Sequence, residues 1–143
     1  MEGYERASRV YTAEAASGLQ WMGPFPNLHD AQMWVNKIVR RSWWKKHCPR
    51  VKKVVCEYRP DKVWHRAPSI SEAGIGRIRF AAGGLCQGVA LHELGHFIAW
   101  SERQDHGAEF VRAEYALYKQ AMGEGIADLL KVSFVEWGVW PSD

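Results

Sequence analysis

The chain has 143 residues, the size of one domain over residues 1–143, and it is long enough to bury a hydrophobic core. Its apolar content of 47% is typical of a globular protein, and the net charge of +3 is too small to indicate nucleic-acid binding by itself. No run of about 18 apolar residues occurs, so no membrane span is predicted.

The cysteine content indicates a reducing environment. Cys48, Cys56 and Cys86 are odd in number and form no C-x-x-C pair. We therefore expect a cytoplasmic protein without a disulfide scaffold. Residues 1–6 include acids and lack an apolar segment, so no signal peptide is expected.

Two amphipathic helices are predicted at the start of the chain. The first covers residues 5–22, and the second begins after Asn27, a good N-cap residue, and covers residues 28–44. The apolar face of the first helix would contain Tyr11, Ala15, Leu19 and Met22. The face of the second would contain Leu28, Ala31, Val35, Ile38 and Val39.

The segment from Arg40 to Lys53 is basic and contains no acid. Trp43, Trp44 and His47 lie between the charges, and basic and aromatic residues together are typical of nucleic-acid surfaces. The alternative is a solvated helix end, in which the cations bind the last carbonyls, and the low net charge favours this alternative. The basic residues are Arg40, Arg41, Lys45, Lys46, Arg50, Lys52 and Lys53.

Alternating patterns predict a small three-stranded sheet. Residues 51–59 form the first strand, with Val54, Cys56 and Tyr58 on one side. Residues 63–65 form a short second strand and residues 68–74 a loop.

The third strand, residues 76–81, has Ile78 and Phe80 inward and Arg77 and Arg79 outward. We expect it to be an edge strand that can bind an extended substrate, with Arg77 or Arg79 beside it.

His92-Glu93-Leu94-Gly95-His96 is the central motif, within an apolar stretch that predicts a buried helix over residues 85–100. Histidines four apart lie on one face of a helix, one turn from each other, so both can bind one metal ion. Glu93 lies about 100° round the helix and can act as general base on a water. This is the H-E-x-x-H arrangement of zinc hydrolases.

A third protein ligand is needed, with the fourth position left open for water. His106, at the start of a helix predicted over residues 107–122, is favoured. Glu124, on a last amphipathic helix after Gly123, is the alternative, because a catalytic zinc ion takes either three His or two His and one Glu. The core side of the last helix would contain Ile126, Leu129, Leu130, Ser133, Phe134 and Trp137.

The motif predicts metal-assisted hydrolysis. Zn²⁺ held by His92, His96 and His106 would lower the pKa of a bound water to about 7, and Glu93 would accept its proton. Candidates to orient the histidines through their other ring nitrogens are Asp105, Glu109, Glu114 and Asp128. Candidates to stabilise the oxyanion are Tyr115 and Tyr118.

The two motifs His92–His96 and residues 106–110, separated by nine residues, resemble the H-E-x-x-H…H-G-x-x-F pattern of SprT-like and WLM-type zinc metallopeptidases. They resemble more closely a small family of metallohydrolases from actinobacteria and their phages, whose V-x-x-H-E-L-x-H, H-G-x-x-F-V and closing G-V segments correspond to residues 89–96, 106–111 and 138–139. Two features depart from related patterns: the glycine of metzincins three residues after the second histidine is absent, and so is a C-x-x-C zinc ribbon.

The element order predicts an α+β fold of N-terminal helices, a small sheet, the H-E-x-x-H helix and two C-terminal helices, and the resemblance implies a minimal zincin-like fold. Three functions are expected from these observations. The first is a zinc metallopeptidase acting on a protein or peptide, and the resemblance to SprT-like peptidases implies proteins bound to DNA as substrates. The second is a zinc amidase for small substrates. The third is a non-catalytic, zinc-braced module that binds nucleic acid or a partner, which the presence of Glu93 disfavours.

Overall fold

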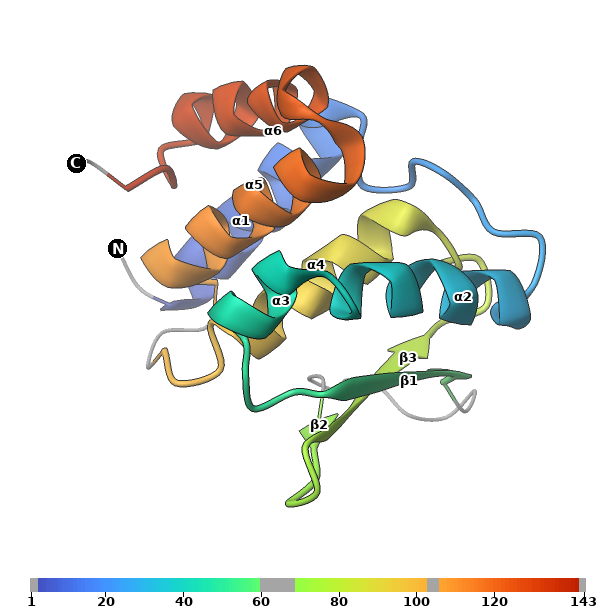
Figure 1. The fold of residues 1–143 in the computed structure, drawn as a ribbon. Coiled ribbons are helices and arrows are strands. Elements are labelled where there is room, and N and C mark those ends of the chain that lie inside the picture. Colours follow the sequence, from blue (N-terminus) through green and yellow to red (C-terminus); the bar gives the residue numbers. More distant parts are fainter. Residues whose placement is uncertain (1–2, 60–68, 103–105, 142–143) are drawn as a thin grey trace.

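The computed structural model describes residues 3–59, 69–102 and 106–141. Within these ranges the chain has six helices and one mixed three-stranded sheet, which confirms the α+β class (Figure 1). The elements are α1 Gly3–Ser17, α2 Leu28–Val39, α3 Ser42–His47, β1 Lys53–Tyr58, β2 Ser69–Ile70, β3 Ile75–Phe80, α4 Gln87–Ile98, α5 Ala108–Met122 and α6 Glu124–Glu136. None of these helices combines the length and apolar content needed to cross a membrane.

Helix α4 lies in the middle of the molecule, between the sheet and the other C-terminal helices (Figure 1). It contacts β3 on one side and α5 on the other, and α2 lies beside it over β1. Helices α1 and α6 pack on each other beyond α4. Leu91, Leu94 and Phe97 of α4 are fully buried in the hydrophobic core. The prediction of a buried helix around the central motif is confirmed.

The sheet differs from the sequence-based expectation in the position of its last strand. Strand β3 is the middle strand, parallel to β1 and antiparallel to β2, so it is not the expected edge strand. The reason is a tight turn at residues 71–74, where positive φ at Gly74 lets Ser69 and Ile70 fold back on β3. This segment was expected to be a loop. Residues 63–65, expected to form a strand, lie outside the described residues.

Helix α1 ends five residues earlier than expected and buries a different face. Gly18 has a φ of 78°, which ends the helix, and the buried side chains are Val10, Ala13 and Glu14. Tyr11, expected in the core, is 47% exposed. The sequence pattern was misleading because it assigned the buried face to the aromatic and larger apolar side chains. Helix α6 instead packs on the face that contains Ala13, where the Ser133 hydroxyl donates to the Ala13 carbonyl.

The segment expected as one helix over residues 28–44 forms two helices. Asn27 caps α2 as predicted, accepting a 2.8 Å hydrogen bond from the Asp30 amide. The predicted apolar face is buried except for Leu28, which is half-buried against the core. The chain then turns at Arg41, which has extended backbone, and restarts as α3. In a continuous helix, Trp44 would point about 180° away from Val35, nine positions at about 100° each. The break lets Trp44 enter the core, where its indole N–H donates to the Val51 carbonyl at 2.9 Å.

The first turn of α4 is held by the loop that follows α1. The amide groups of Gln87 and Gly88 donate to the carbonyls of Gly23 and Met22, at 2.9 and 3.2 Å. A Cβ atom on Gly88 would lie 2.3 Å from the Leu19 carbonyl oxygen, so only glycine allows this approach. The contact brings the end of α1 against the helix that contains the central motif.

The C-terminal helices confirm the predicted break and correct one predicted face. Gly123, with a φ of 92°, separates α5 from α6. Leu129 and Trp137, both predicted on the core side, are 54% and 41% exposed, because α6 meets α1 and α5 through the neighbouring face. That face contains Ala127, Leu130, Ser133 and Phe134.

Candidate metal centre

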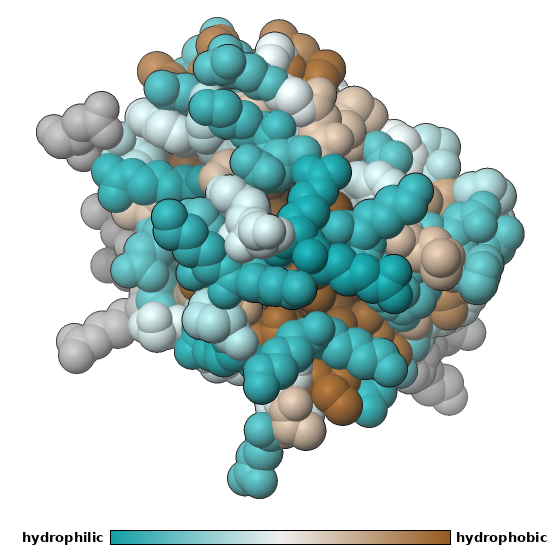
Figure 2. All heavy atoms as spheres, in the orientation of Figure 1, coloured by the Kyte–Doolittle hydropathy of each residue, from teal (hydrophilic) through white to brown (hydrophobic). Residues whose placement is uncertain are grey.

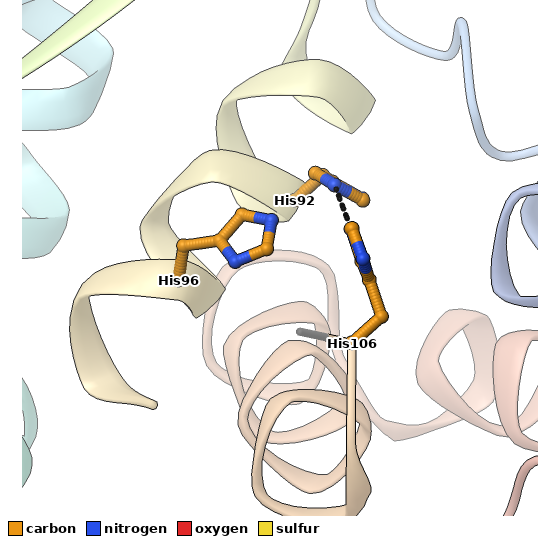
Figure 3. A group of neighbouring side chains, drawn as sticks. All are labelled: His92, His96 and His106. Atoms are coloured by element: carbon orange, nitrogen blue, oxygen red, sulfur yellow. Dashed lines mark hydrogen bonds between the residues drawn. The ribbon is translucent and has the colours of Figure 1, made fainter. Parts of the chain in front are cut away.

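Three imidazoles converge between α4 and the start of α5 (Figure 3). His92 and His96 come from successive turns of α4, and His106 lies two residues before the start of α5. One ring nitrogen of each lies within 4.8 Å of the others. The Nε2 atoms of His92 and His106 are 3.1 Å apart. The three side chains that the sequence predicted as a group are therefore brought together.

The separation of two of these nitrogens, one from His92 and one from His106, suits a single small cation. Two nitrogens bound at about 2.0–2.1 Å to a tetrahedral ion lie roughly 3.3–3.4 Å apart. The 3.1 Å separation of the two Nε2 atoms is close to that value. Burial, together with the charges of His92 and His106, lowers the pKa of His96 to about 2. His96 is thus the neutral imidazole that a metal ion requires.

Glu124, the alternative third ligand, lies elsewhere. Its side chain is 69% exposed at the start of α6, where it pairs with Lys119 at 3.9 Å. It belongs to neither of the two groups of possible metal ligands found among the described residues. The geometry therefore selects His106 to complete the cluster.

Two buried carboxylates hold His92 from its other side. Its Nδ1 atom lies 2.5 Å from Glu14 Oε2 on α1 and 3.3 Å from Glu114 Oε2 on α5. These three residues form the second group that can hold a cation. Because Nδ1 faces Glu14, Nε2 is the nitrogen of His92 that faces the other two histidines, and it must lose its proton when a metal ion binds.

The electrostatics of this group depend on which carboxyl is ionised. Burial opposes ionisation of Glu14, but the charge and hydrogen bond of His92 outweigh it and keep the pKa of Glu14 low. Burial and the neighbouring charge of Glu14 raise the pKa of Glu114 well above its usual value. Burial would lower the pKa of His92, but Glu14 and Glu114 raise it well above its usual value. Glu14 is therefore the anion that holds His92, and Glu114 is the neutral partner.

Glu14 contacts His92 but is not among the residues that the sequence predicted for the site. Of the four candidates to orient a histidine, Glu114 contacts His92, whereas Asp128 accepts a hydrogen bond from Tyr115 and Asp105 lies outside the described residues. Glu109 is exposed at the start of α5. The available signal for Glu14 was its position one turn after Val10, which places an acid on the buried face of α1.

The backbone of His106 is held in an uncommon conformation. Its φ of 57° lies in the left-handed region, which costs a non-glycine residue on the order of 1–3 kcal/mol. Arg6 of α1 donates to the His106 carbonyl at 2.8 Å and to the Val139 carbonyl at 2.9 Å. Glu102 accepts from the amides of Glu109 and Phe110 at the start of α5, at 2.7 and 3.0 Å. These contacts fix the position from which the imidazole reaches α4.

Aromatic rings surround the histidines. The Phe110 ring lies 4.4 Å from that of His96 and 4.8 Å from that of His106, and Tyr11 stacks on His92 at 5.3 Å. Tyr115 and Tyr118, the predicted oxyanion residues, donate instead to Asp128 and to the Leu19 carbonyl. The tyrosine beside the imidazoles is therefore Tyr11.

Glu93 is half-buried, and it lines a pocket of about 250 Å³ together with His92 and Tyr11. Of the three imidazoles, that of His92 is among the residues that line this pocket, so the pocket borders one side of the cluster. A base acting beside a metal ion would need to lie next to the ligands in this way.

The basic segment lies on the face that contains α2 and α3, where hydrophilic side chains cover much of the surface (Figure 2). All seven of its cations are exposed. Trp44, however, is in the core, and Trp43 is half-buried and stacks on His47 at 4.4 Å. The segment thus offers charge for phosphates and less aromatic surface than its sequence indicates, and nucleic-acid binding stays a prediction.

No protein-family model, curated protein or solved structure matches this chain.

Proposed function

We propose that the protein is a zinc-dependent hydrolase with a zincin-like fold, and that its substrate is a protein or peptide. The observation that supports this most directly is the convergence of His92, His96 and His106, with two Nε2 atoms 3.1 Å apart. Three imidazoles with a nearby glutamate are a common ligand and base set for catalytic zinc. The three buried thiols, none in a disulfide, are compatible with a reducing compartment such as the cytoplasm.

Each residue has a distinct part in the proposed reaction. His92, His96 and His106 would hold the ion, and Glu14 would orient His92 through Nδ1. A zinc ion held there supplies Lewis-acid activation of water and of a substrate carbonyl. Glu93 accepts the proton of the attacking water and then gives it to the leaving amine as the carbon–nitrogen bond breaks.

Two other functions use the same residues. An amidase for small substrates would need the same base and ligands, and the modest pocket volume of about 250 Å³ is compatible with it. A non-catalytic zinc-braced module would need no base, so a half-buried glutamate at the pocket wall favours an enzyme.

The first experiment measures bound metal and peptide hydrolysis in the purified full chain. We expect one zinc ion per chain in the wild type and in Glu93→Gln, and less in His92→Ala and His106→Ala. Glu93→Gln should lose about 10²–10⁴-fold in hydrolysis, the usual contribution of a general base. Glu124→Gln is the matched control and should keep both metal and activity, because Glu124 is exposed on α6.

The outcomes separate the candidate functions. Metal retention with hydrolysis lost in Glu93→Gln supports catalysis, and hydrolysis of amides but not peptides identifies the amidase. Metal that stabilises the fold without any hydrolysis would identify the structural module. Protein that binds no divalent ion would refute the proposal.

A further inference from the structure

The pocket beside Glu93 has one polar end and aromatic walls. Its volume of about 250 Å³ is below the roughly 300–1,000 Å³ of sites for drug-sized ligands, so it suits one side chain or chain end. Tyr11 and Trp21 line it with exposed rings, and Val89 adds aliphatic surface. Such walls bind the apolar stem of a ligand and leave its end to polar groups.

Arg59, directly after β1, is the one arginine or lysine among the described residues that line this pocket. It is half-buried, and no described carboxylate lies within ion-pair distance of its guanidinium. Gln20, on the pocket wall, offers an amide as a second hydrogen-bonding group.

Unlike Arg59, the two arginines of β3 form ion pairs with a described carboxylate. Arg77 and Arg79, which the sequence suggested would flank a substrate, both pair with Glu57 on the exposed face of the sheet, at 3.4 and 2.7 Å. Their charges are neutralised within the sheet. Among the described residues that line the pocket beside His92, Arg59 is the one that offers a positive charge to a substrate.

The acids of the pocket do not take up this charge. Glu14 is engaged with His92 at 2.5 Å, and the ion pairs of the described residues include none between Glu93 and Arg59. An arginine that forms no ion pair with the described carboxylates, in a partly closed site, favours an anionic ligand with planar geometry. A carboxylate meets this requirement, and its stem would lie against Tyr11 and Trp21.

We propose that this pocket is a substrate subsite that binds a carboxylate through Arg59, next to the bond that Glu93 helps to cleave. The carboxylate is either a glutamate side chain or the free C-terminus of a peptide, since both present the same group. This subsite rests on the proposed hydrolase function for its place in the reaction. Binding of the carboxylate itself requires only Arg59 and the pocket walls.

The hydrolysis experiment compares matched peptides that have Glu or Gln beside the cleaved bond, each with a free or an amidated C-terminus. The wild type should prefer a peptide with a carboxylate, either the Glu side chain or the free C-terminus. For that peptide, Arg59→Gln should raise KM roughly tenfold or more, the usual loss for a charged hydrogen bond. The effect on kcat should be smaller. The KM of the neutral peptide should not change. Arg59→Lys should recover part of the loss, and Arg50→Gln, an exposed arginine outside the pocket, should match the wild type.

A binding experiment distinguishes failure of the subsite from failure of the hydrolase proposal. The metal-free full chain is titrated with N-acetylglutamate methylamide, N-acetylglutamine with a free carboxylate, and the neutral N-acetylglutamine methylamide. The indole N–H resonance of Trp21, assigned with Trp21→Phe, should shift with at least one acid and not with the neutral compound. The shift should be lost in Arg59→Gln and kept in Arg50→Gln.

Binding of an acid that depends on Arg59 supports the subsite even if no peptide is cleaved, and in that case the hydrolase proposal alone fails. Equal binding of the acids and the neutral amide would overturn the subsite. So would acid binding that Arg59→Gln leaves intact, and so would peptide cleavage without preference for a carboxylate.

Discussion

At the residue scale, His92 is used at both ring nitrogens. Nδ1 lies 2.5 Å from Glu14, and Nε2 lies 3.1 Å from Nε2 of His106. The first contact sets the tautomer and the ring orientation, and the second sets the distance across the candidate cation site. A carboxylate on α1 therefore contributes to a site formed by α4 and the start of α5.

We predict that Glu14→Gln lowers zinc affinity by about 10–100-fold, the usual effect of losing the group that orients a ligating histidine. The substitution keeps the shape of the side chain and removes its charge. Glu5→Gln on the same helix is the control, because Glu5 is exposed and pairs only with Arg9 among the described residues.

Competition with a chromophoric chelator measures both affinities. If Glu14→Gln bound zinc as tightly as Glu5→Gln, Glu14 would have no part in orienting His92.

At the element scale, α4 is held by close contacts at two of its glycines. Gly88 meets the carbonyls after α1, and Gly95, within the motif itself, faces α5. A Cβ atom at Gly95 would lie 3.1 Å from the Phe110 ring, which packs against all three imidazoles. Gly95 thus allows α5 to approach closely enough for His106 to reach His92 and His96.

Gly95→Ala should destabilise the protein by about 1–3 kcal/mol, the usual cost of adding volume to a packed core. Gly125→Ala in α6 is the matched control, because no heavy atom lies within 4 Å of its added Cβ. That change should be neutral or stabilising by up to about 1 kcal/mol, because alanine restricts the unfolded chain. Urea unfolding measures both values, and equal stability of the two variants would argue against the close contact.

At the scale of the whole molecule, the core contains thiol and phenol groups whose pKa values are higher in the folded chain than in the unfolded chain. Burial raises the pKa of Cys48 and Cys86, raises that of Cys56 to about 12, and raises that of Tyr118. Each thiol has an unperturbed pKa of 9.0. The unfolded chain therefore loses these protons first as the pH rises.

We predict that the contribution of these buried thiols to the free energy of unfolding is constant below about pH 9 and falls above it, by at most about 1.4 kcal/mol per pH unit for each shifted group. Above about pH 9 the unfolded chain releases the thiol protons, whereas the folded chain keeps them. Rising pH therefore favours the unfolded chain. For Cys56 the loss should extend from about pH 9 to about pH 12.

Urea unfolding at several pH values in the presence of a reductant measures this slope. Cys56→Ala should show a shallower fall than the wild type. A slope that Cys56→Ala leaves unchanged would exclude Cys56 as its source.

The chain itself determined the elements that local patterns encode. The 3.6-residue period and the apolar stretch predicted the buried helix that contains His92 and His96. Because residues four apart lie on the same face of a helix, the two imidazoles were also expected side by side. Asn27, Gly123 and the alternation of Ile78 and Phe80 likewise acted through local backbone geometry. These features need no knowledge of the other elements.

Only the tertiary structure determined which distant side chains meet the motif. Glu14 lies 78 residues from His92, and the sequence left His106 and Glu124 as alternatives. Arg59 reaches the pocket of Glu93 from the end of a strand. Such pairings depend on how α1, α5 and the sheet pack on α4, and a long-range contact leaves no periodic signal in either of the segments that form it.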